Sequence, residues 1–380
     1  MKFAFFMMPV HHPRENPALA FQRDIELIHL AERLDFDEFY IGEHHSGGWE
    51  TMPCPMMALS MAAANAHRIR LGTSVVNLPF HHPFHVAERI AFLDHLTRGR
   101  AILGVGPSNL ITDKRLFNIP QDELYPMMFE SIEVIVRLLE SEEPFSHHGR
   151  FWQFDDMRLQ LRSYQTPRLP LAVASSTGSP EILEVAARHG MMLWSTIGRN
   201  RPSKLADNWA FVEAAAKKHG RTAARADWRL ATCVHLAETR DQAWAEAETG
   251  IMREAEYFSA VGLKMSYEQY PNQPFDEFTP QSCAEQREWI VGTPDDAIAW
   301  IEQKQRETGG FGGLLITTHA WTGSETARRS IEMFARYVMP HFRGHNATFK
   351  DEWRRIVEAR DKQGGVPPVP KGARHSLAGG

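Results

Sequence analysis

Short apolar segments alternate with amphipathic segments along most of the chain, and this alternation is the strongest structural signal in the sequence. The apolar segments have the length of buried strands, and the segments between them repeat apolar residues at helical spacing. Alternating strand and helix units are typical of a parallel sheet covered by helices. The eight segments that we predict to be strands span residues 3–8, 38–42, 69–78, 101–105, 169–174, 191–197, 228–236 and 313–318.

Two of the intervening segments carry clear helix signals. Asn16 precedes Pro17 at the start of one apolar pattern, and asparagine suits the N-cap while proline suits the first turn. Pro83 opens another pattern, which stops at Gly99. Eight such units in a chain of this length favour a closed barrel over an open doubly wound sheet. We therefore predict an α/β fold, a (β/α)8 TIM barrel, in a single domain that spans residues 1–362.

Two stretches depart from this repeat. Residues 257–290 contain four glycine or proline positions among polar and aromatic residues and precede the last predicted strand. Such an insertion can form a mobile lid, and it can equally be an ordered excursion packed on the barrel. Residues 363–380 are rich in glycine and proline, which predicts a flexible C-terminal tail.

Composition narrows the classes of function. The chain has 380 residues, of which 43% are hydrophobic and 23% are charged, with a formal net charge of -5. This balance gives no basic footprint for nucleic acid. The apolar run at residues 3–8 is too short for a signal peptide or a membrane span, and three scattered cysteines offer no disulfide framework. We expect a cytoplasmic protein that binds neither nucleic acid nor membrane.

The first candidate for chemistry follows the second predicted strand. Glu43, His44 and His45 leave the buried run 38–42, and the carboxyl ends of the strands form the active site of a parallel α/β barrel. Histidine titrates near neutral pH, so His44 held by Glu43 or by the backbone could act as a general acid or base. A purely structural histidine at a strand end is an equally good explanation of this pattern.

A glycine-rich turn follows the fourth predicted strand. It begins like a dinucleotide-binding motif at Gly104 and Gly106, but Asn109 replaces the third glycine and Pro107 removes a backbone donor. We reject a Rossmann motif. Gly106 still leaves room for a planar ring to approach the backbone, although a plain tight turn explains it as well.

The turn after the fifth predicted strand consists of Ser175, Ser176, Thr177, Gly178 and Ser179, and a helical pattern follows it. A helix N-terminus offers free backbone amides and a partial positive charge, which together suit a phosphate group. An ordinary serine N-cap would give the same pattern.

The 19 histidines raise the question of a metal site. His81 and His85 are four residues apart, but Pro83 disfavours the helical conformation of the residue before it, so the pair would not share a helix face. No metalloenzyme motif accompanies them. We predict no catalytic metal.

In their order and spacing, motifs along nearly the whole chain resemble the bacterial luciferase-like flavin monooxygenases. The stretch 42–50 and the early Glu15-Asn16-Pro17 are similar to the limonene-monooxygenase type branch of that family. The motifs are Gly42-Glu43-His44-His45, Arg70-Leu71-Gly72-Thr73, Leu78-Pro79 with His82-Pro83, Gly99-Arg100, Ser175-Ser176, Val291-Gly292-Thr293-Pro294 and Val338-Met339-Pro340.

The resemblance implies a luciferase-like barrel that binds reduced flavin mononucleotide (FMN), supplied by a separate NAD(P)H-dependent flavin reductase. It assigns chemistry at the flavin peroxide to His44, and it places a non-proline cis peptide bond between Ser74 and Val75 beneath the isoalloxazine ring. The serines of the turn at 175–179 match positions that hold the flavin phosphate. The cofactor-binding residues that we expect are Glu43, Ser74, Val75, Gly106, Ser175, Ser176, Thr177, Gly178 and Ser179.

One position departs from the family pattern. In luciferase an arginine contacts the phosphate after the fourth strand, and Pro107 takes the matching place here. Phosphate binding would then rely on the serine turn and on another cation such as Arg115.

The implied reaction is a two-component oxygenation. Reduced FMN and O2 form a flavin hydroperoxide, one oxygen atom enters a small apolar organic substrate (a terpene, ketone or aldehyde), and the other leaves as water. The family also implies a homodimer, or a heterodimer with a related subunit. The side chains that could form an apolar substrate pocket are Phe6, Met7, Met8, Phe80, Trp194 and Trp321.

Two alternatives stay open at this point. One is a deazaflavin-dependent oxidoreductase of the same superfamily, which would move a hydride. The other is a non-catalytic flavin-binding barrel, acting as a subunit or a cofactor store. His44 argues against storage, because a store needs no proton donor.

Overall fold

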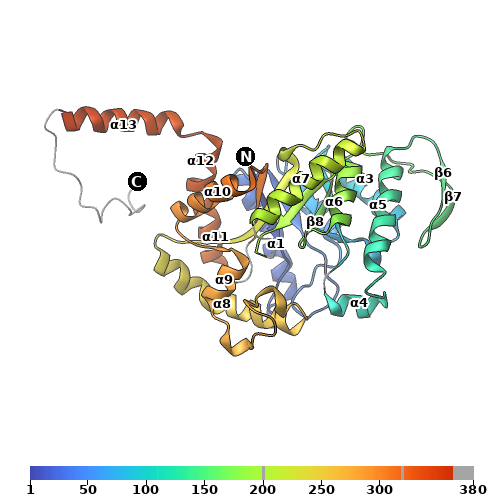
Figure 1. Cartoon of the computed structure of the whole chain (residues 1–380), viewed down its shortest axis with the longest axis horizontal. Coiled ribbons are helices and arrows are strands. Elements are labelled where there is room, and N and C mark those ends of the chain that lie inside the picture. Colours follow the sequence, from blue (N-terminus) through green and yellow to red (C-terminus); the bar gives the residue numbers. More distant parts are fainter. Residues whose placement is uncertain (109, 199–201, 318–320, 363–380) are drawn as a thin grey trace.

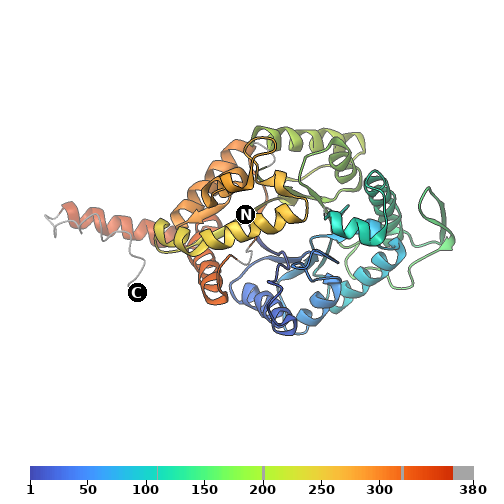
Figure 2. The ribbon, with the colours of Figure 1, turned by 90° about the horizontal axis from the view of Figure 1, so that it is seen from below.

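The computed structural model describes residues 1–108, 110–198, 202–317 and 321–362, and in this part of the chain eight parallel strands close into a barrel surrounded by helices (Figures 1 and 2). Each strand pairs with the next, and β12 pairs with both β10 and β1 to complete the circle. The predicted TIM barrel is therefore confirmed. The barrel strands are β1 (Lys2–Met7), β2 (Glu38–Ile41), β3 (Arg70–Thr73), β5 (Ala101–Gly106), β8 (Leu171–Ser175), β9 (Met192–Thr196), β10 (Trp228–Leu236) and β12 (Gly313–Thr317).

Alternation along each strand divides the core into two layers, because successive side chains point to opposite faces. Phe3 and Phe5 of β1 face the outer helices, and Phe5 stacks on Phe39 with ring centroids 5.2 Å apart. Ala4 and Tyr40 belong to the cluster inside the barrel. The strands are apolar on both faces, which is why they appear in the sequence as continuous hydrophobic runs.

The barrel interior also holds a buried ion pair. Arg229 of β10 donates to both carboxylate oxygens of Glu38, at 3.0 and 2.8 Å, and both side chains are almost fully buried. Tyr40 donates a further hydrogen bond to Glu38 at 2.8 Å. Arg229 thus supplies the largest part of the compensation for the charge of Glu38, with smaller contributions from Tyr40 and Arg70.

Replacing Arg229 by methionine is expected to lower the free energy of unfolding by about 3–5 kcal/mol, because Glu38 would remain buried without its cation. Urea denaturation would measure this change. Arg188→Met is the matched control, because the Arg188–Glu133 pair is half exposed and such pairs contribute about 0–1 kcal/mol. Equal losses in the two variants would contradict the role of the buried pair.

The helices begin at sites that side chains can cap. Asn16 accepts from the backbone amide of Ala18 at 3.0 Å, as its position before Pro17 predicts. Thr293 and Asp296 form a capping box. The helices are α1 (Pro17–Arg33), α2 (Pro55–Ala63), α3 (Pro83–Leu96), α4 (Ile111–Phe117), α5 (Leu124–Glu140), α6 (Pro180–His189), α7 (Pro202–Lys218), α8 (Arg240–Ala260), α9 (Pro280–Arg287), α10 (Pro294–Thr308), α11 (Ser324–Met333), α12 (Met339–Arg343) and α13 (Ala347–Lys362), with short helical turns η1 (Leu78–Phe80), η2 (Arg225–Asp227), η3 (Lys264–Ser266), η4 (Phe275–Glu277) and η5 (Phe334–Val338).

Three features differ from the predicted strand pattern. The run 69–78 is divided into β3 and a short β4 (Val76–Asn77), which pairs with β5. An antiparallel hairpin of β6 (Phe145–His148) and β7 (Gln153–Met157) projects beside α5 (Figure 1). A further strand, β11 (Ile290–Gly292), pairs with β10 outside the barrel circle. The last residue of the predicted run 313–318 lies outside the described residues.

Residues 257–290 are ordered into the end of α8, the turns η3 and η4, and α9, followed by the first residue of β11. Their apolar side chains form a second core cluster, in which Tyr267 and Trp289 are buried against each other. This arrangement agrees with a packed excursion, and opening of the segment as a lid stays a prediction.

The last described helix, α13, projects away from the barrel (Figures 1 and 2). None of its residues is buried, and Phe349 and Trp353 are 75% and 66% exposed. The expected tail at 363–380 lies outside the described residues. Within the described helices, none has the length and apolar character needed to cross a membrane.

Candidate active site

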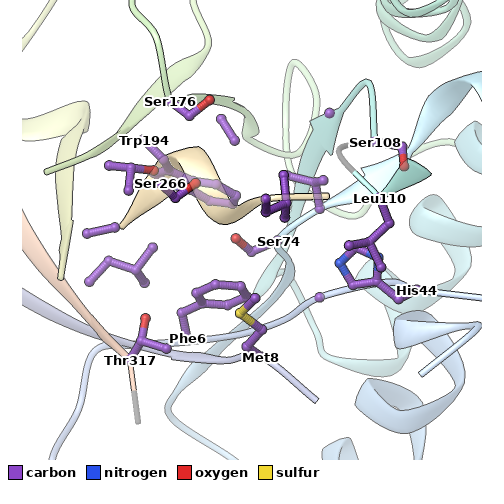
Figure 3. Close-up of a pocket in the computed structure, with 18 of the residues that line it drawn as sticks. Phe6, Met8, His44, Ser74, Ser108, Leu110, Ser176, Trp194, Ser266 and Thr317 are labelled. Atoms are coloured by element: carbon purple, nitrogen blue, oxygen red, sulfur yellow. The ribbon is translucent and has the colours of Figure 1, made fainter. Parts of the chain in front are cut away.

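A cavity of about 260 Å³ lies at the carboxyl ends of the barrel strands. Phe6 of β1 and Trp194 of β9 line its apolar part, while His44, Ser74 and Ser176 bring polar groups from the loops that follow three strands (Figure 3). This is the end of the barrel at which TIM-barrel enzymes carry their active sites.

His44 lies on the cavity wall between two carboxylates. Its Nδ1 is 3.0 Å from Oδ2 of Asp113 on α4, and its Nε2 is 3.0 Å from Oε2 of Glu50. Both carboxylate side chains are fully buried. Tyr257, near the end of α8, donates to Oε1 of Glu50 at 3.2 Å.

These neighbours determine the charge of the imidazole ring. Burial alone lowers the pKa of His44, but the carboxylates of Glu50 and Asp113 outweigh burial and raise that pKa above its ordinary value. Burial raises the pKa of Asp113, but hydrogen bonds from His44 and Ser46 lower it overall. The raised pKa favours the protonated ring, which hydrogen-bonds to Asp113 through Nδ1 and lies within ion-pair distance of Glu50 through Nε2.

Sequence reasoning found His44 but missed Glu50, Asp113 and Tyr257. Glu50 lies in the motif 42–50, six residues after His44, and a carboxylate this close to a candidate acid was a usable signal. Asp113 is 69 residues from His44 and Tyr257 is 207 residues from Glu50, and no local pattern in the sequence links them.

Glu43 contributes to the cavity wall, but its carboxylate does not bind His44. Its Oε1 accepts from Nε2 of His45 at 3.0 Å and from Nε2 of His81 at 2.9 Å. Of the two histidines after this strand, Glu43 therefore holds His45, whereas His44 turns toward Asp113 and Glu50. These three residues form the one group in the described chain that is close enough to hold a metal ion, and their hydrogen bonds already explain the spacing. The absence of a catalytic metal stays a prediction.

The floor of the cavity contains the cis peptide bond that was expected between Ser74 and Val75. Gly106, at the end of β5, lies directly against it, and a Cβ on Gly106 would be 2.6 Å from Cγ2 of Val75. The glycine at this position therefore allows close packing beneath the cavity. Asn109 lies outside the described residues.

The serine turn is split between two roles. Ser176 lines the cavity, whereas Ser175 is buried and accepts from the amide of Gly178 at 3.1 Å. Ser179 is the N-cap of α6 and accepts from Ile182 at 3.4 Å. Thr177 is exposed. Of this turn, the hydroxyl of Ser176 and the N-terminus of α6 are thus the groups placed to meet a phosphate.

Several polar atoms beside the cavity are buried without a hydrogen-bond partner among the described residues. They are Oγ of Ser108, Nε1 of Trp194 and Nε of Arg287. Buried polar atoms normally find partners, so this wall suits a polar ligand such as the ring and phosphate of a flavin. Arg115 is exposed on α4 and does not line the cavity. The structure therefore does not support Arg115 as a substitute for the phosphate-binding arginine that luciferase has at the position of Pro107.

The apolar part of the cavity contains half of the side chains expected there. Phe6, Met8 and Trp194 line it. Met7 faces the outer core because it alternates with Phe6. Phe80 stacks on Phe117 with centroids 4.3 Å apart, and Trp321 packs on Trp289 at 4.7 Å.

A family model described as luciferase-like monooxygenase matches residues 1–311. The chain belongs to the luciferase-like monooxygenase family. Sequence comparison also confirms the similarity to the limonene-monooxygenase branch. The limonene 1,2-monooxygenase of Rhodococcus erythropolis is 35% identical over 344 residues, which cover 90% of this chain and 87% of the relative.

Other members of the luciferase-like monooxygenase family are similar over comparable lengths. The 4-hydroxyprotoasukamycin monooxygenase of Streptomyces nodosus subsp. asukaensis is 38% identical over 349 residues, covering 90% of this chain and 93% of the relative. The crystal structure of monooxygenase RslO1 from Streptomyces bottropensis superposes with a TM-score of 0.80 at 26% identity, covering 90% of this chain and 100% of that one. The oxygenating constituent of 3,6-diketocamphane monooxygenase from Pseudomonas putida, solved with FMN, shares the fold with a TM-score of 0.76 at 22% identity, covering 90% and 98%.

Proposed function

We propose that the protein is the oxygenase component of a two-component flavin-dependent monooxygenase that uses reduced FMN and O2. The observation that carries this proposal is His44, which lies between the carboxylates of Glu50 and Asp113 on the wall of a cavity at the catalytic end of the barrel. The 35–38% identical relatives are named as monooxygenases. A more distant relative is named as the oxygenase component of flavin-dependent trigonelline monooxygenase, which supports a separate NAD(P)H-dependent reductase as the partner.

The residues of the cavity fit a bound flavin. Ser74, Val75 and Gly106 would lie against the planar ring, and Ser176 with the N-terminus of α6 would hold the phosphate. Reduced FMN bound there would supply electrons to O2, so that one oxygen atom enters the substrate and the other leaves as water. The chain itself would bind, orient and protonate the reactants.

His44 is the group that holds the proton. Its Nδ1 is fixed by Asp113, whereas its Nε2, which carries the second proton of the charged ring, lies 3.0 Å from Oε2 of Glu50. Transfer of this second proton to a reacting oxygen in the cavity would leave a neutral imidazole, which regains a proton from water before the next turnover. Asp113 keeps the ring in one orientation throughout, as in other carboxylate–histidine pairs.

Residues 257–290 would keep water away from the reaction. Phe258, Leu263, Tyr267 and Trp289 from this segment line the cavity, and a dry site limits the loss of activated oxygen as H2O2. A small organic substrate, such as a terpene, ketone or aldehyde, would lie against these apolar side chains.

Gly106→Ala tests the floor of the proposed flavin site. The new methyl group would push Val75 toward the cavity, where the flavin ring would lie. If bound FMN meets an overpacking cost of about 1–3 kcal/mol, its affinity falls roughly tenfold or more. Gly323→Ala is the control, because a Cβ there meets nothing within 4 Å. Equilibrium dialysis would measure both dissociation constants, and an unchanged constant for Gly106→Ala would remove this surface from the flavin site.

The deazaflavin alternative has weaker support. An F420-dependent glucose-6-phosphate dehydrogenase of Intrasporangium calvum is 26% identical over 331 residues, which is below the 35–38% identity of the limonene and 4-hydroxyprotoasukamycin monooxygenases. Direct comparison of FMN and F420 binding separates the two cofactors. A barrel that binds FMN without any turnover would instead favour the storage alternative.

We also propose that the protein dimerises, preferentially with itself. The helices α2 and α3 pack side by side and expose apolar side chains, among them Met57 at 74%, Met61 at 67% and Phe92 at 55%. Such patches usually mark interaction surfaces. Light scattering after gel filtration should give twice the chain mass of 43.3 kDa, and a single-chain mass at micromolar concentration would contradict the homodimer.

A further inference from the structure

Arg287 is a cation on the cavity wall, and none of the described residues forms an ion pair with it. It is the last residue of α9, it lines the cavity, and its Nε is buried without a hydrogen-bond partner among the described residues. Its guanidinium carbon lies 5.8 Å from the ring centroid of Tyr267. Arg287 as a whole is partly exposed, but buried polar atoms such as its Nε normally have a hydrogen-bond partner, so this donor suits an anionic oxygen from outside the chain.

The carboxylates near Arg287 are already occupied by other donors. Glu254 accepts from the hydroxyl of Tyr267 at 3.0 Å and from Nε1 of Trp321 at 2.5 Å. Glu288, the next residue in the chain, is paired with Lys304. In the part of the chain that the structure describes, Arg287 forms no ion pair, and its positive charge stays available to a ligand.

The surroundings of Arg287 indicate the shape of that ligand. Tyr267 and Trp289 supply aromatic surfaces on the cavity wall, and Ser266 adds a hydroxyl group beside them. A planar ring can pack against such surfaces, while a guanidinium group binds an oxygen that carries negative charge through a charge-assisted hydrogen bond. A plain hydrocarbon would leave the arginine unpaired when water is expelled.

We propose that Arg287 binds an anionic or conjugated carbonyl oxygen of a planar substrate, so that the enzyme acts on phenols, quinones or enones rather than on plain hydrocarbons. This assignment rests on the proposed oxygenase function and names the substrate class for the same cavity. In a phenol, Arg287 stabilises the phenolate, which is the electron-rich form that accepts an oxygen atom. In an enone or quinone, it stabilises the charge that develops on the carbonyl oxygen when the conjugated bond is attacked.

The phosphate of FMN is the other source of anionic oxygen. Arg287 lies beside the loop after β9, because a Cβ on Gly198 would be 2.6 Å from the α-carbon of Arg287. The serine turn follows the neighbouring strand β8. The two sources therefore have to be separated by experiment.

The experiment measures ligand binding without turnover. 4-Nitrophenol and nitrobenzene differ by one ionisable hydroxyl group. Both affinities are measured by quenching of tryptophan fluorescence, at a pH above the pKa of 4-nitrophenol so that this ligand is present as the phenolate. The wild type should bind 4-nitrophenolate roughly tenfold to a hundredfold more tightly than nitrobenzene, as expected for a hydrogen bond to a charged group. Arg287→Met should abolish this preference and leave nitrobenzene binding unchanged, while Arg287→Lys should retain part of it.

FMN and riboflavin provide the second arm, because they differ only by the phosphate. The proposal expects Arg287→Met to leave their affinity ratio unchanged, and this result would also show that the variant is folded. A selective loss of FMN affinity would assign Arg287 to the phosphate and overturn the proposal, as would unchanged binding of 4-nitrophenolate. Neither arm needs reduced flavin or O2, so failure of the oxygenase function would be seen separately, in assays of turnover.

Discussion

His44→Asn is expected to lower the rate of product formation by about 10²–10⁴-fold, the usual contribution of a positioned acid or base. The asparagine amide can still donate to Asp113 from the place of Nδ1, but it has no proton to give to the cavity. Binding of FMN should stay within about threefold of the wild type, because the serine turn and the cavity floor are unchanged. The measurement is product formed per reduced FMN oxidised, with an acceptor found by screening ketones, alkenes and phenols.

His85→Asn is the matched control for this variant. His85 is exposed on α3 and bonds to Glu88, far from the carboxylates that hold His44. We expect its product yield to equal that of the wild type. Full product formation by His44→Asn would contradict the role of His44 as proton donor, and loss of FMN binding would assign the residue to the cofactor instead.

Glu50→Gln is expected to move the alkaline limit of activity to lower pH. The carboxylate of Glu50 is the largest of the influences that raise the pKa of His44 against the effect of burial. A glutamine keeps an acceptor for Tyr257 but presents no charge to Nε2, so the pKa of His44 falls. Activity that needs the protonated ring should be lost as pH rises through this pKa. The loss should therefore occur at a lower pH in Glu50→Gln than in the wild type. The imidazole titration, followed by NMR with labelled histidine, measures the shift directly.

The raised pKa of His44 in the wild type also affects the pH dependence of stability. Because the pKa of folded His44 lies above its unfolded value of about 6.5, its stabilisation is fully present below pH of about 6.5 and is lost as pH rises through the folded pKa. Glu50→Gln should move this loss to lower pH. Glu142→Gln, which removes an exposed partner of Arg162, should leave the titration of His44 unchanged. An identical titration in Glu50→Gln and the wild type would show that Glu50 does not set the charge of His44.

The barrel could be predicted from the sequence because its strands are buried on both faces. The eight segments, from 3–8 to 313–318, are mostly apolar, as expected for parallel strands covered on both faces, and their number favoured a closed barrel. The hairpin of β6 and β7 was missed for the opposite reason. Its strands carry His147, His148, Asp155 and Asp156 and are mostly exposed, so they have the polarity of a loop.

The site could be predicted only where it is local in sequence. The position of His44 at a strand end and the cap at Ser179 follow from neighbouring residues, and the cis bond at Ser74 follows from family resemblance. Asp113 and Arg287 reach the cavity through the packing of α4 and α9, which no short motif encodes. Arg287 lies inside the segment 257–290, where prolines and polar residues suggested only an insertion. Its role depends on the carboxylates of Glu254 and Glu288 being occupied elsewhere, and only the folded structure shows this.

The most direct test of the account is an anaerobic titration of the protein with reduced FMN, followed by rapid mixing with O2 and observation of the near-ultraviolet absorbance. The account predicts tight binding of reduced FMN and, after mixing, a transient spectrum that differs from both reduced and oxidised FMN and outlasts the oxidation of free FMN. Direct appearance of oxidised FMN at the rate of the free cofactor, with one H2O2 for each flavin, would contradict oxygen activation by this protein.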